Sequence, residues 1–456
     1  MVFQNKFITV VGLFLLIMFI SFISTLTHFL AIILSSIFLL IALGIVYNYR
    51  IKLDILNYFS IFIMTTSVSF NMIKHNTGFI IVVSVIFMYC ISFFLERNHR
   101  KINNIGIYFF MIFWIIWSMG QIIFVQYGYQ TLDHLKSLLF GTFIIWIMNK
   151  LINNKNRIDM LYTAWGTSIF ITTLVGWWEL LTNNHLPTSR AYIENISNVA
   201  TAGFYNQNDY GFFLALGLPI MFYWTKKKSL YKIMGIYMLV SSFYFSYVNG
   251  SRSILLIFFV ALSLYLISLI KDNKKLLIFF LISILIGVIK FWNVINDSFN
   301  EILTLNNADS SLNERQWLTK SALDIFQSNP YGVGPGNLEL YMPIQGLRVH
   351  NFWLEILVNY GLIVFLGLII IFAIFFIKKF NIDKETQKTI NPMFWSVLIF
   401  IPTCVVSSSI FQMNITWFIL GLIACSMNYM NKSKKRNRND RDLTNGVAGM
   451  GIKLNK

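Results

Sequence analysis

The stretch GLIVFLGLIIIFAIFFI (361–377) decides the fold, because none of its side chains carries a charge or a hydrogen-bonding group. A second run that is almost as apolar, FITVVGLFLLIMFISFISTL (7–26), stands near the start of the chain. A helix of about 20 mainly apolar residues spans a bilayer, where lipid offers the backbone no hydrogen-bonding partner. Only 12% of the 456 residues are charged, against roughly 25% in soluble domains. The sequence therefore predicts a polytopic membrane protein.

Fourteen apolar segments can be read along the chain, and four of them are short. The predicted fold is an all-α polytopic membrane protein of about 12–14 transmembrane helices, with a large, partly helical extracytoplasmic loop between two late spans. The segments lie near residues 7–26, 28–47, 55–70, 78–95, 105–126, 137–152, 159–182, 209–224, 231–248, 253–270, 276–291, 352–377, 392–410 and 412–429. Cys90, Cys404 and Cys425 all lie in these segments, so they predict buried small side chains and no disulfide framework or metal site.

The distribution of basic residues orients the chain. If the N-terminus is cytoplasmic, all but eight of the 36 basic residues fall on the cytoplasmic side, as the positive-inside rule requires. The net charge of +17 then needs no nucleic-acid partner. We divide the chain into a transmembrane domain, 1–430, and a basic tail, 431–456. The tail is expected to be cytoplasmic, disordered and attracted to membrane lipid. Both termini are thus expected in the cytoplasm.

The eight exceptions point to the outer face. They are Lys74, Lys136, Arg190, Arg252, Lys290, Arg315, Lys320 and Arg348. The four arginines lie in two long outer connections, 183–208 and 292–351, or at the tight turn NGSR (249–252). Loops longer than about 12–15 residues are uncommon in compact domains and are often functional. A single arginine at the outer end of a span is also a common interfacial anchor, so each arginine taken alone decides nothing.

The middle of the large loop predicts a helix. ERQWLTKSALDIFQ (314–327) has helical spacing, with Trp317, Ala322 and Ile325/Phe326 on one expected buried side. Asn329–Pro330 should end this helix. GVGPG (332–336) then reads as a structural turn on general turn chemistry, with a phosphate-binding nest as the alternative.

RVHNFWLEILVNYG (348–361) places ionisable groups at the mouth of an apolar run. Asn351 is a candidate helix N-cap, and His350 precedes it. Glu355 lies inside the apolar run, where an ionisable residue is by default functional or paired. Helix entrances often hold a histidine that only caps or hydrogen-bonds. These residues by themselves predict a polar cavity at the outer membrane face.

Four motifs in order resemble the O-antigen ligase/O-antigen polymerase superfamily of bacterial membrane glycosyltransferases. They are GFYNQNDYGFFLALGLP (203–219), NGSRSILL (249–256), SSLNERQWLTKSALDIFQSNPYGVGPGN (310–337), and a histidine–asparagine pair followed after nine residues by glycine, at His350, Asn351 and Gly361. The chain departs from the family pattern at Val364, where a small, hydroxylated or tyrosine residue is common, and at Thr319, where many ligases have leucine. The resemblance covers roughly residues 185–380.

The resemblance implies a substrate and a reaction. The donor would be an oligosaccharide on undecaprenyl diphosphate at the outer face of the bacterial cytoplasmic membrane, and an acceptor glycan hydroxyl would displace the lipid diphosphate. Arginines can neutralise that leaving group without a metal or other cofactor, because guanidinium grips phosphate oxygens bidentately and keeps its charge. The outward carboxylates Asp297, Glu301, Asp309 and Glu314 are scattered and do not have metal-like spacing.

The expected catalytic residues are Arg252 and Arg315, which would hold the diphosphate, and His350, whose ordinary pKa of about 6.5 suits a general base. Glu355 could tune His350, although five residues along a helix it points roughly 140° away. The expected substrate-binding residues are Arg190, Asn206, Asn208, Arg348, Asn351 and Glu355.

Three functions remain open at this point. A polymerase would join lipid-linked repeat units into an O-antigen, capsule or exopolysaccharide. A ligase would move finished glycan to a lipid A core, a protein or another acceptor. A flippase would transport the lipid-linked oligosaccharide, but it would place its charges near the membrane midplane. The resemblance also suggests a flippase and a chain-length regulator as protein partners.

Overall fold

The computed structural model describes residues 105–125, 130–187, 189–228, 230–270, 310–344, 348–405 and 410–449, and the elements in these ranges are all helical. The helices of the bundle are α5 (Ile105–Phe124), α6 (Thr131–Leu151), α7 (Lys155–Thr182), α9 (Gln207–Thr225), α10 (Leu230–Val248), α11 (Arg252–Ile270), α16 (Phe352–Phe380), α17 (Lys384–Thr403) and α18 (Asn414–Gly449). The connections hold α8 (Arg190–Ile193), α14 (Ser310–Ser328), α15 (Leu338–Tyr341) and the short 3₁₀ helix η2 (Ile410–Gln412).

The predicted all-α polytopic fold is confirmed. Each of the nine apolar segments that fall within the described residues corresponds to one helix. The segments 7–26, 28–47, 55–70, 78–95 and 276–291 lie outside the described residues, as does Cys90. Cys404 and Cys425 are buried free thiols, as expected. Among the described helices, four are long and apolar enough to cross a membrane by themselves: α5, α6, α7 and α16.

Two predicted helix ends are wrong. The segment 392–410 corresponds to α17, which begins at Lys384 and ends at Thr403. It begins early because the Asp383 side chain caps it, accepting a hydrogen bond from the backbone N–H of Thr386. α18 begins at Asn414 and continues to Gly449, beyond the expected apolar segment 412–429. A helix started in an apolar segment can extend because each further residue adds a hydrogen bond without a new nucleus.

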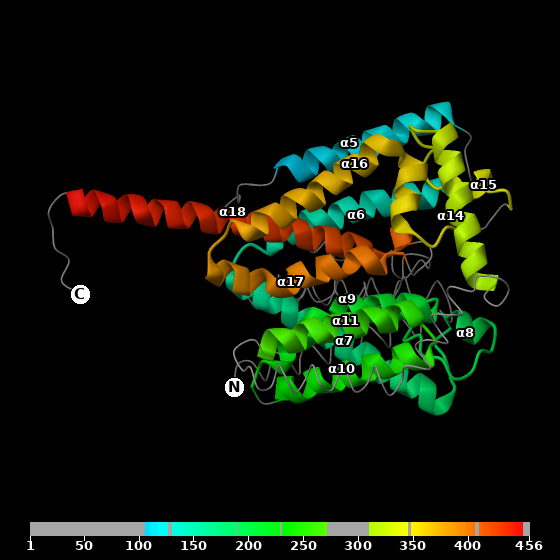
Figure 1. Ribbon diagram of the computed structural model, residues 1–456, viewed down its shortest axis with the longest axis horizontal. Coiled ribbons are helices and arrows are strands. Elements are labelled where there is room, and N and C mark those ends of the chain that lie inside the picture. Colours follow the sequence, from blue (N-terminus) through cyan, green and yellow to red (C-terminus); the bar gives the residue numbers. More distant parts are fainter. Residues whose placement is uncertain are drawn as a thin grey trace, which may run out of the picture.

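α9 lies at the centre of the bundle. Figure 1 shows α9, α11, α7 and α10 on one side of the molecule and α17, α6, α18, α16 and α5 on the other. Most residues of α9 are buried, so this helix contacts protein more than lipid. Phe212 of α9 packs against Phe400 of α17, which in turn packs against Phe352 at the start of α16, with ring centroids 6.1 and 5.5 Å apart. These contacts join the two sides near the entrance of α16.

A small residue allows α6 and α18 to approach each other closely. A Cβ atom at Gly141 of α6 would overlap the ring of Trp417 of α18. Helices in membranes associate through such small-residue contacts, because lipid supplies no hydrophobic drive between them.

The connections divide between two ends of the bundle. One end, the loop end, holds the connections 183–206, 249–251, 310–351 and 404–413, and Figure 1 shows α14 lying across it. The other end, the basic end, holds the short connections 152–154, 226–229 and 381–383, whose flanks carry lysines such as Lys226, Lys378 and Lys384. The charge pattern therefore separates along the helix axes, as the topology prediction expects.

Candidate active site

A small core at the loop end holds α14 against α16. It is formed by buried residues of α14, α15, α16 and the segments between them, with further partly buried apolar residues around it. The buried members are Leu318, Ala322, Val333, Leu338, Met342, Val349 and Val358. We call this set the loop core. The predicted helix 314–327 and its end before Asn329–Pro330 are confirmed by α14, but the prediction that Trp317 is buried is wrong: it is 38% exposed, and the adjacent Leu318 is buried instead.

GVGPG is a structural turn in this molecule. Its glycines Gly332, Gly334 and Gly336 all have positive φ, at 93°, 95° and 71°. Residues other than glycine rarely adopt these backbone conformations. The N–H of Val333 donates to the carbonyl of Val358, and the N–H of Gly334 to that of Asn359, each at 2.9 Å. Since these amides are bonded to α16, they do not form a phosphate nest.

α16 offers those carbonyls because its helix is broken at Gly361, where φ is 83° and ψ is 175°. The break leaves carbonyls of the preceding turn without helical partners. Side chains of α5 bond two of them: the Trp117 indole donates to the carbonyl of Tyr360 at 2.8 Å, and the Gln121 amide donates to the carbonyl of Asn359 at 3.3 Å. The break therefore joins the glycine turn to α5 and α16.

His350 lies in a segment with anchors on both sides. Val349 before it is buried in the loop core. Asn351 after it caps α16 as predicted, accepting hydrogen bonds from the backbone N–H groups of Trp353 and Leu354. The N–H of Phe352 donates to the carbonyl of Cys404 at 3.0 Å. His350 itself is half-buried, so its ring position is restricted while a substrate can still reach it.

Arg315 lies close enough to His350 to influence its charge. Burial lowers the pKa of His350 from its ordinary value of 6.5, and the positive charges of Arg315 and Arg348 lower it further, while the Glu314 carboxylate acts in the opposite direction. Arg315 precedes Leu318 by one turn of α14, and Val349 adjoins His350, so both candidate residues are attached to the loop core. The structure thus brings two of the three predicted catalytic residues together.

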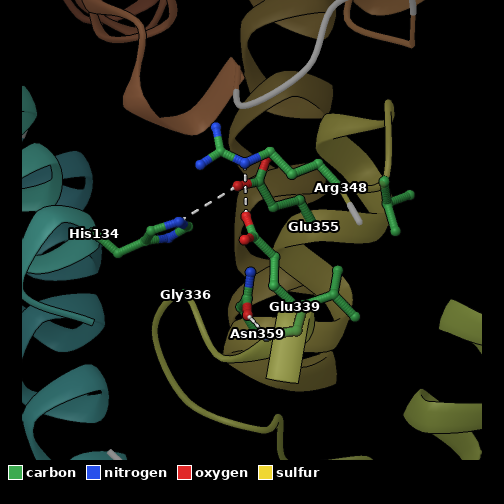
Figure 2. A pocket seen from close by; sticks show the side chains of 8 residues that line it. His134, Gly336, Glu339, Arg348, Glu355 and Asn359 are labelled. Carbon is green, nitrogen blue, oxygen red and sulfur yellow. Dashed lines mark hydrogen bonds and ion pairs between the residues drawn. The ribbon is translucent and has the colours of Figure 1, made fainter. Parts of the chain in front are cut away.

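A polar pocket lies directly beside this segment. Figure 2 shows His134 of α6 on one side, with Arg348, Glu355 and Glu339 gathered on the other. The Arg348 Nε atom lies 2.8 Å from Glu339 Oε1, and the His134 Nε2 atom lies 3.6 Å from Glu355 Oε1. Asn359 accepts a hydrogen bond from the backbone N–H of Leu338 through its Oδ1 atom. The cavity volume is about 20 Å³, enough for a water molecule.

The pocket shows which partners two of the expected residues have. Arg348, expected to bind substrate, pairs with Glu339, and its contact with substrate stays a prediction. Glu355, which could tune His350, has its Oε1 atom beside the His134 ring, in agreement with the 140° angle between positions 350 and 355 on a helix. His134, Glu339 and Asn359 were missed as site residues. Each of them is a scarce polar residue in or near an apolar segment, and that signal was available in the sequence.

The predicted residues of α9 and α11 form a second group at the loop end. Asn206 caps α9 by accepting from the Asn208 N–H at 2.6 Å, and Asn208 accepts a hydrogen bond from the Ser251 hydroxyl at 2.5 Å. Arg252 is the next residue and the first of α11. Asn249 bonds both the N–H and the carbonyl of Ala200 through its side chain. The turn carrying Arg252 is therefore fixed to the connection 183–206.

A buried carboxylate holds that connection in place. Glu179 of α7 is fully buried and accepts hydrogen bonds from the Thr201 hydroxyl at 2.9 Å and from the backbone N–H groups of Thr201 and Ala202 at 2.5 and 2.7 Å. Ala202 has a φ of 48°, which a non-glycine residue seldom adopts. Arg190, expected to bind substrate, is exposed and pairs with Glu194 at 2.8 Å.

The fold and these residues define a multi-pass membrane protein with a polar site at one end of its helices. Residues 237–369 match the family model described as O-antigen ligase, a range that includes Arg252, Arg315, His350 and Gly361. The teichuronic acid biosynthesis protein TuaE of Bacillus subtilis (strain 168) is 24% identical to this chain over 374 residues. The match covers 75% of this chain and 75% of the relative. Both findings confirm the resemblance seen in the motifs: they support the O-antigen ligase/O-antigen polymerase superfamily as the family of this chain.

The pKa of His350 leads to a prediction about pH. Because the pKa lies below 6.5, the neutral imidazole persists into mildly acidic solution, and glycosyl transfer should fall only as the pH drops through that lowered value. Glu314→Gln removes the carboxylate that raises the pKa, so the acid limb of the rate profile should move to lower pH. Glu314 is exposed and screened by water and salt, so we expect this shift to be small.

Purified protein in vesicles, assayed between pH 4.5 and 8, would measure this shift. Asp324→Asn is the matched control, because Asp324 is also exposed on α14 but does not influence His350. An acid limb that moves to higher pH in Glu314→Gln, or equally in both variants, contradicts the assignment of that limb to His350.

Proposed function

We propose that this protein is a polysaccharide polymerase. Membership of the superfamily assigns it to polysaccharide biosynthesis with a glycosyltransferase-type activity. The finer proposal is that it joins undecaprenyl-diphosphate-linked oligosaccharide repeat units at the outer face of the bacterial cytoplasmic membrane. The loop end would then be extracytoplasmic, and the basic end and both termini cytoplasmic.

The proposed reaction forms one carbon–oxygen bond, breaks one carbon–oxygen bond and transfers one proton. The acceptor hydroxyl oxygen attacks the anomeric carbon of the donor sugar, and the bond from that carbon to the diphosphate oxygen breaks. The bonding electrons leave with the lipid diphosphate, and the hydroxyl proton passes to the neutral imidazole of His350. No oxidant, reductant or external group is needed for this balance.

Charge on the departing diphosphate is the largest electrostatic demand of the reaction. We assign its neutralisation to Arg315 and Arg252, because fixed guanidinium groups at a lipid-walled site act where the dielectric is low. Such groups would make a metal ion unnecessary. Asn206 and Asn208 then serve by fixing the turn before Arg252, in addition to any contact with sugar.

The observation that supports this proposal most is the shared anchoring of Arg315 and His350. A phosphate-binding cation and a base of lowered pKa are both attached to the loop core and lie within electrostatic reach of each other. A flippase would not need such a pair, because it makes and breaks no covalent bond. The ligase reading shares the chemistry and differs only in the acceptor.

Composition favours the polymerase over the ligase. The chain is rich in phenylalanine, with 44 residues, and in isoleucine, asparagine and lysine. This composition is typical of A+T-rich genomes, which include many capsule-forming bacteria without lipid A.

Deletion of the gene, followed by analysis of lipid-linked glycans, tests the proposal. A polymerase predicts that single lipid-linked repeat units accumulate and that the wild-type chain restores long polymer. Long but unattached chains would instead identify a ligase, and precursors kept on the cytoplasmic face would identify a flippase. In the deletion strain complemented with the wild-type chain, cross-linking in the membrane can detect a flippase or a chain-length regulator as a partner.

A further inference from the structure

We propose that Glu339 is a positioning residue for glycosyl transfer: by pairing with Arg348, it fixes the segment that carries His350 to the start of α6. This inference rests on the proposed function, because it assigns a role to the surroundings of the proposed base. It adds Glu339 and Gln130 to the site, and it gives Arg348 a role other than contact with the diphosphate.

The first support is the ion pair itself. Arg348 Nε and Glu339 Oε1 are 2.8 Å apart, and the side chain of Glu339 is only 11% exposed while that of Arg348 is 29% exposed. A pair that water reaches so little is screened less than a surface pair. Removing one partner would leave the other charge with less compensation in a partly buried site.

The second support is that Glu339 is attached to the helical bundle. Its other carboxylate oxygen, Oε2, accepts a hydrogen bond from the Gln130 amide at 2.7 Å, and Gln130 directly precedes α6. A neighbouring hydrogen bond joins the same two segments: the Thr131 hydroxyl donates to the Asn337 Oδ1 atom at 3.0 Å. α15 is therefore tied to the start of α6 by two neighbouring hydrogen bonds.

α15 is also tied to α16, the helix that follows His350. The Asn359 side chain accepts from the Leu338 N–H at 2.9 Å, next to Glu339. The carboxylate that holds Arg348 is thus fixed from two directions, by α6 and by α16. A support of this kind can set the position of a mobile side chain.

The third support is the short distance along the chain from Arg348 to His350. Consecutive Cα atoms are about 3.8 Å apart, so two residues span less than about 8 Å. Val349 between them is 5% exposed and lies in the loop core. A shift of Arg348 away from Glu339 would therefore move the His350 backbone or pull Val349 out of its packing. Displacement of a reacting group by about 1 Å can reduce a rate roughly 100-fold.

A double-mutant cycle tests this proposal with the full-length protein in vesicles and a lipid-linked repeat unit as substrate. The variants are Glu339→Gln, Arg348→Gln, the double variant, and the charge reversal Glu339→Arg/Arg348→Glu. Asp133→Asn is the control, because it breaks the exposed Asp133–Lys136 pair on α6 at the same end of the molecule. Rates at saturating donor, donor KM, membrane yield and thermal unfolding are measured for each.

We expect each single variant to lower kcat about 10–100-fold, with donor KM changed less than twofold and with normal membrane yield. The double variant should be no worse than the poorer single variant, because the effects share one contact. The charge reversal should recover part of the loss, and Asp133→Asn should remain within twofold of wild type. If the single and double variants all lower the unfolding temperature, recovery of that temperature in the charge reversal still supports the contact, and absence of recovery opposes it.

Two results would overturn the inference while leaving the proposed function intact. A large rise in donor KM for Arg348→Gln, with little effect of Glu339→Gln, would place Arg348 on the diphosphate. Losses that multiply in the double variant would show that the residues act independently. His350→Ala in the same preparation separates the two claims: if it retains normal turnover, the proposed base fails as well.

Discussion

Replacing His350 by alanine is expected to lower the rate of glycosyl transfer about 10²–10⁴-fold, the usual contribution of a general base. The protein should still insert and fold, because the anchors of this segment are its neighbours Val349 and Asn351. Donor binding should change little, since the imidazole meets the acceptor hydroxyl. Polymer length in cells and single-turnover rates in vesicles measure the two parts of this expectation.

Arg315→Lys and Arg252→Lys extend the same prediction to the leaving group. A lysine keeps the charge but cannot offer the planar pair of donors that matches a phosphate, so most activity should be lost. Lys320→Gln is the control on α14, because Lys320 is an exposed cation whose removal should leave polymer output unchanged. If Arg252→Lys and His350→Ala both keep near-normal output, the catalytic assignment is wrong.

The helices were predictable because lipid imposes one requirement on every span, a run of apolar residues long enough to cross. Their ends were not, since these depend on single side chains. Asp383 starts α17 by capping it, and no change of hydropathy marks that position. The side of α14 that faces the loop core was predictable in principle: Leu318 lies four residues before Ala322, whereas Trp317 lies five before it and so points roughly 140° away.

Half of the candidate site could be predicted for a related reason. His350, Arg315 and Arg348 stand out in the sequence because ionisable residues are rare in this chain. Glu339 and His134 are just as scarce, but their place in the site could not be predicted, because their partners are distant in sequence: Glu339 meets Gln130 across 209 positions, and His134 meets Tyr360 across 226. The pairing of Arg348 could not be predicted either, because only the fold shows its carboxylate partner.

Gly361→Ala is expected to cause the second large loss. At φ 83° and ψ 175°, Gly361 occupies a region of backbone space that is essentially restricted to glycine, and a side chain there costs about 1–3 kcal/mol. A Cβ atom would also overlap the backbone of Tyr331 and lie 2.9 Å from the N atom of Gly332. Backbone atoms cannot rotate away as a side chain can, so the glycine turn must move.

Movement of that turn would spread to the catalytic residues. The turn is bonded to α16 through Val333 and Gly334, and Val333 belongs to the loop core that anchors Arg315 and His350. We therefore expect Gly361→Ala to lower the unfolding temperature and to reduce glycosyl transfer more than 10-fold, a loss typical of misplaced catalytic groups. The measurement is thermal unfolding in detergent alongside polymer output at equal membrane yield.

Gly120→Ala is the control for this variant, because Gly120 lies in α5 and a Cβ atom there meets no described atom within 4 Å. Alanine favours the helix over glycine by up to about 1 kcal/mol, so this variant should be neutral or slightly stabilised. If both variants keep normal stability and output, the bend in α16 is not what holds the loop core in place. A different outcome is that Gly361→Ala unfolds at a normal temperature but makes no polymer. In that case the break at Gly361 sets the geometry of the site around His350 and contributes little to stability.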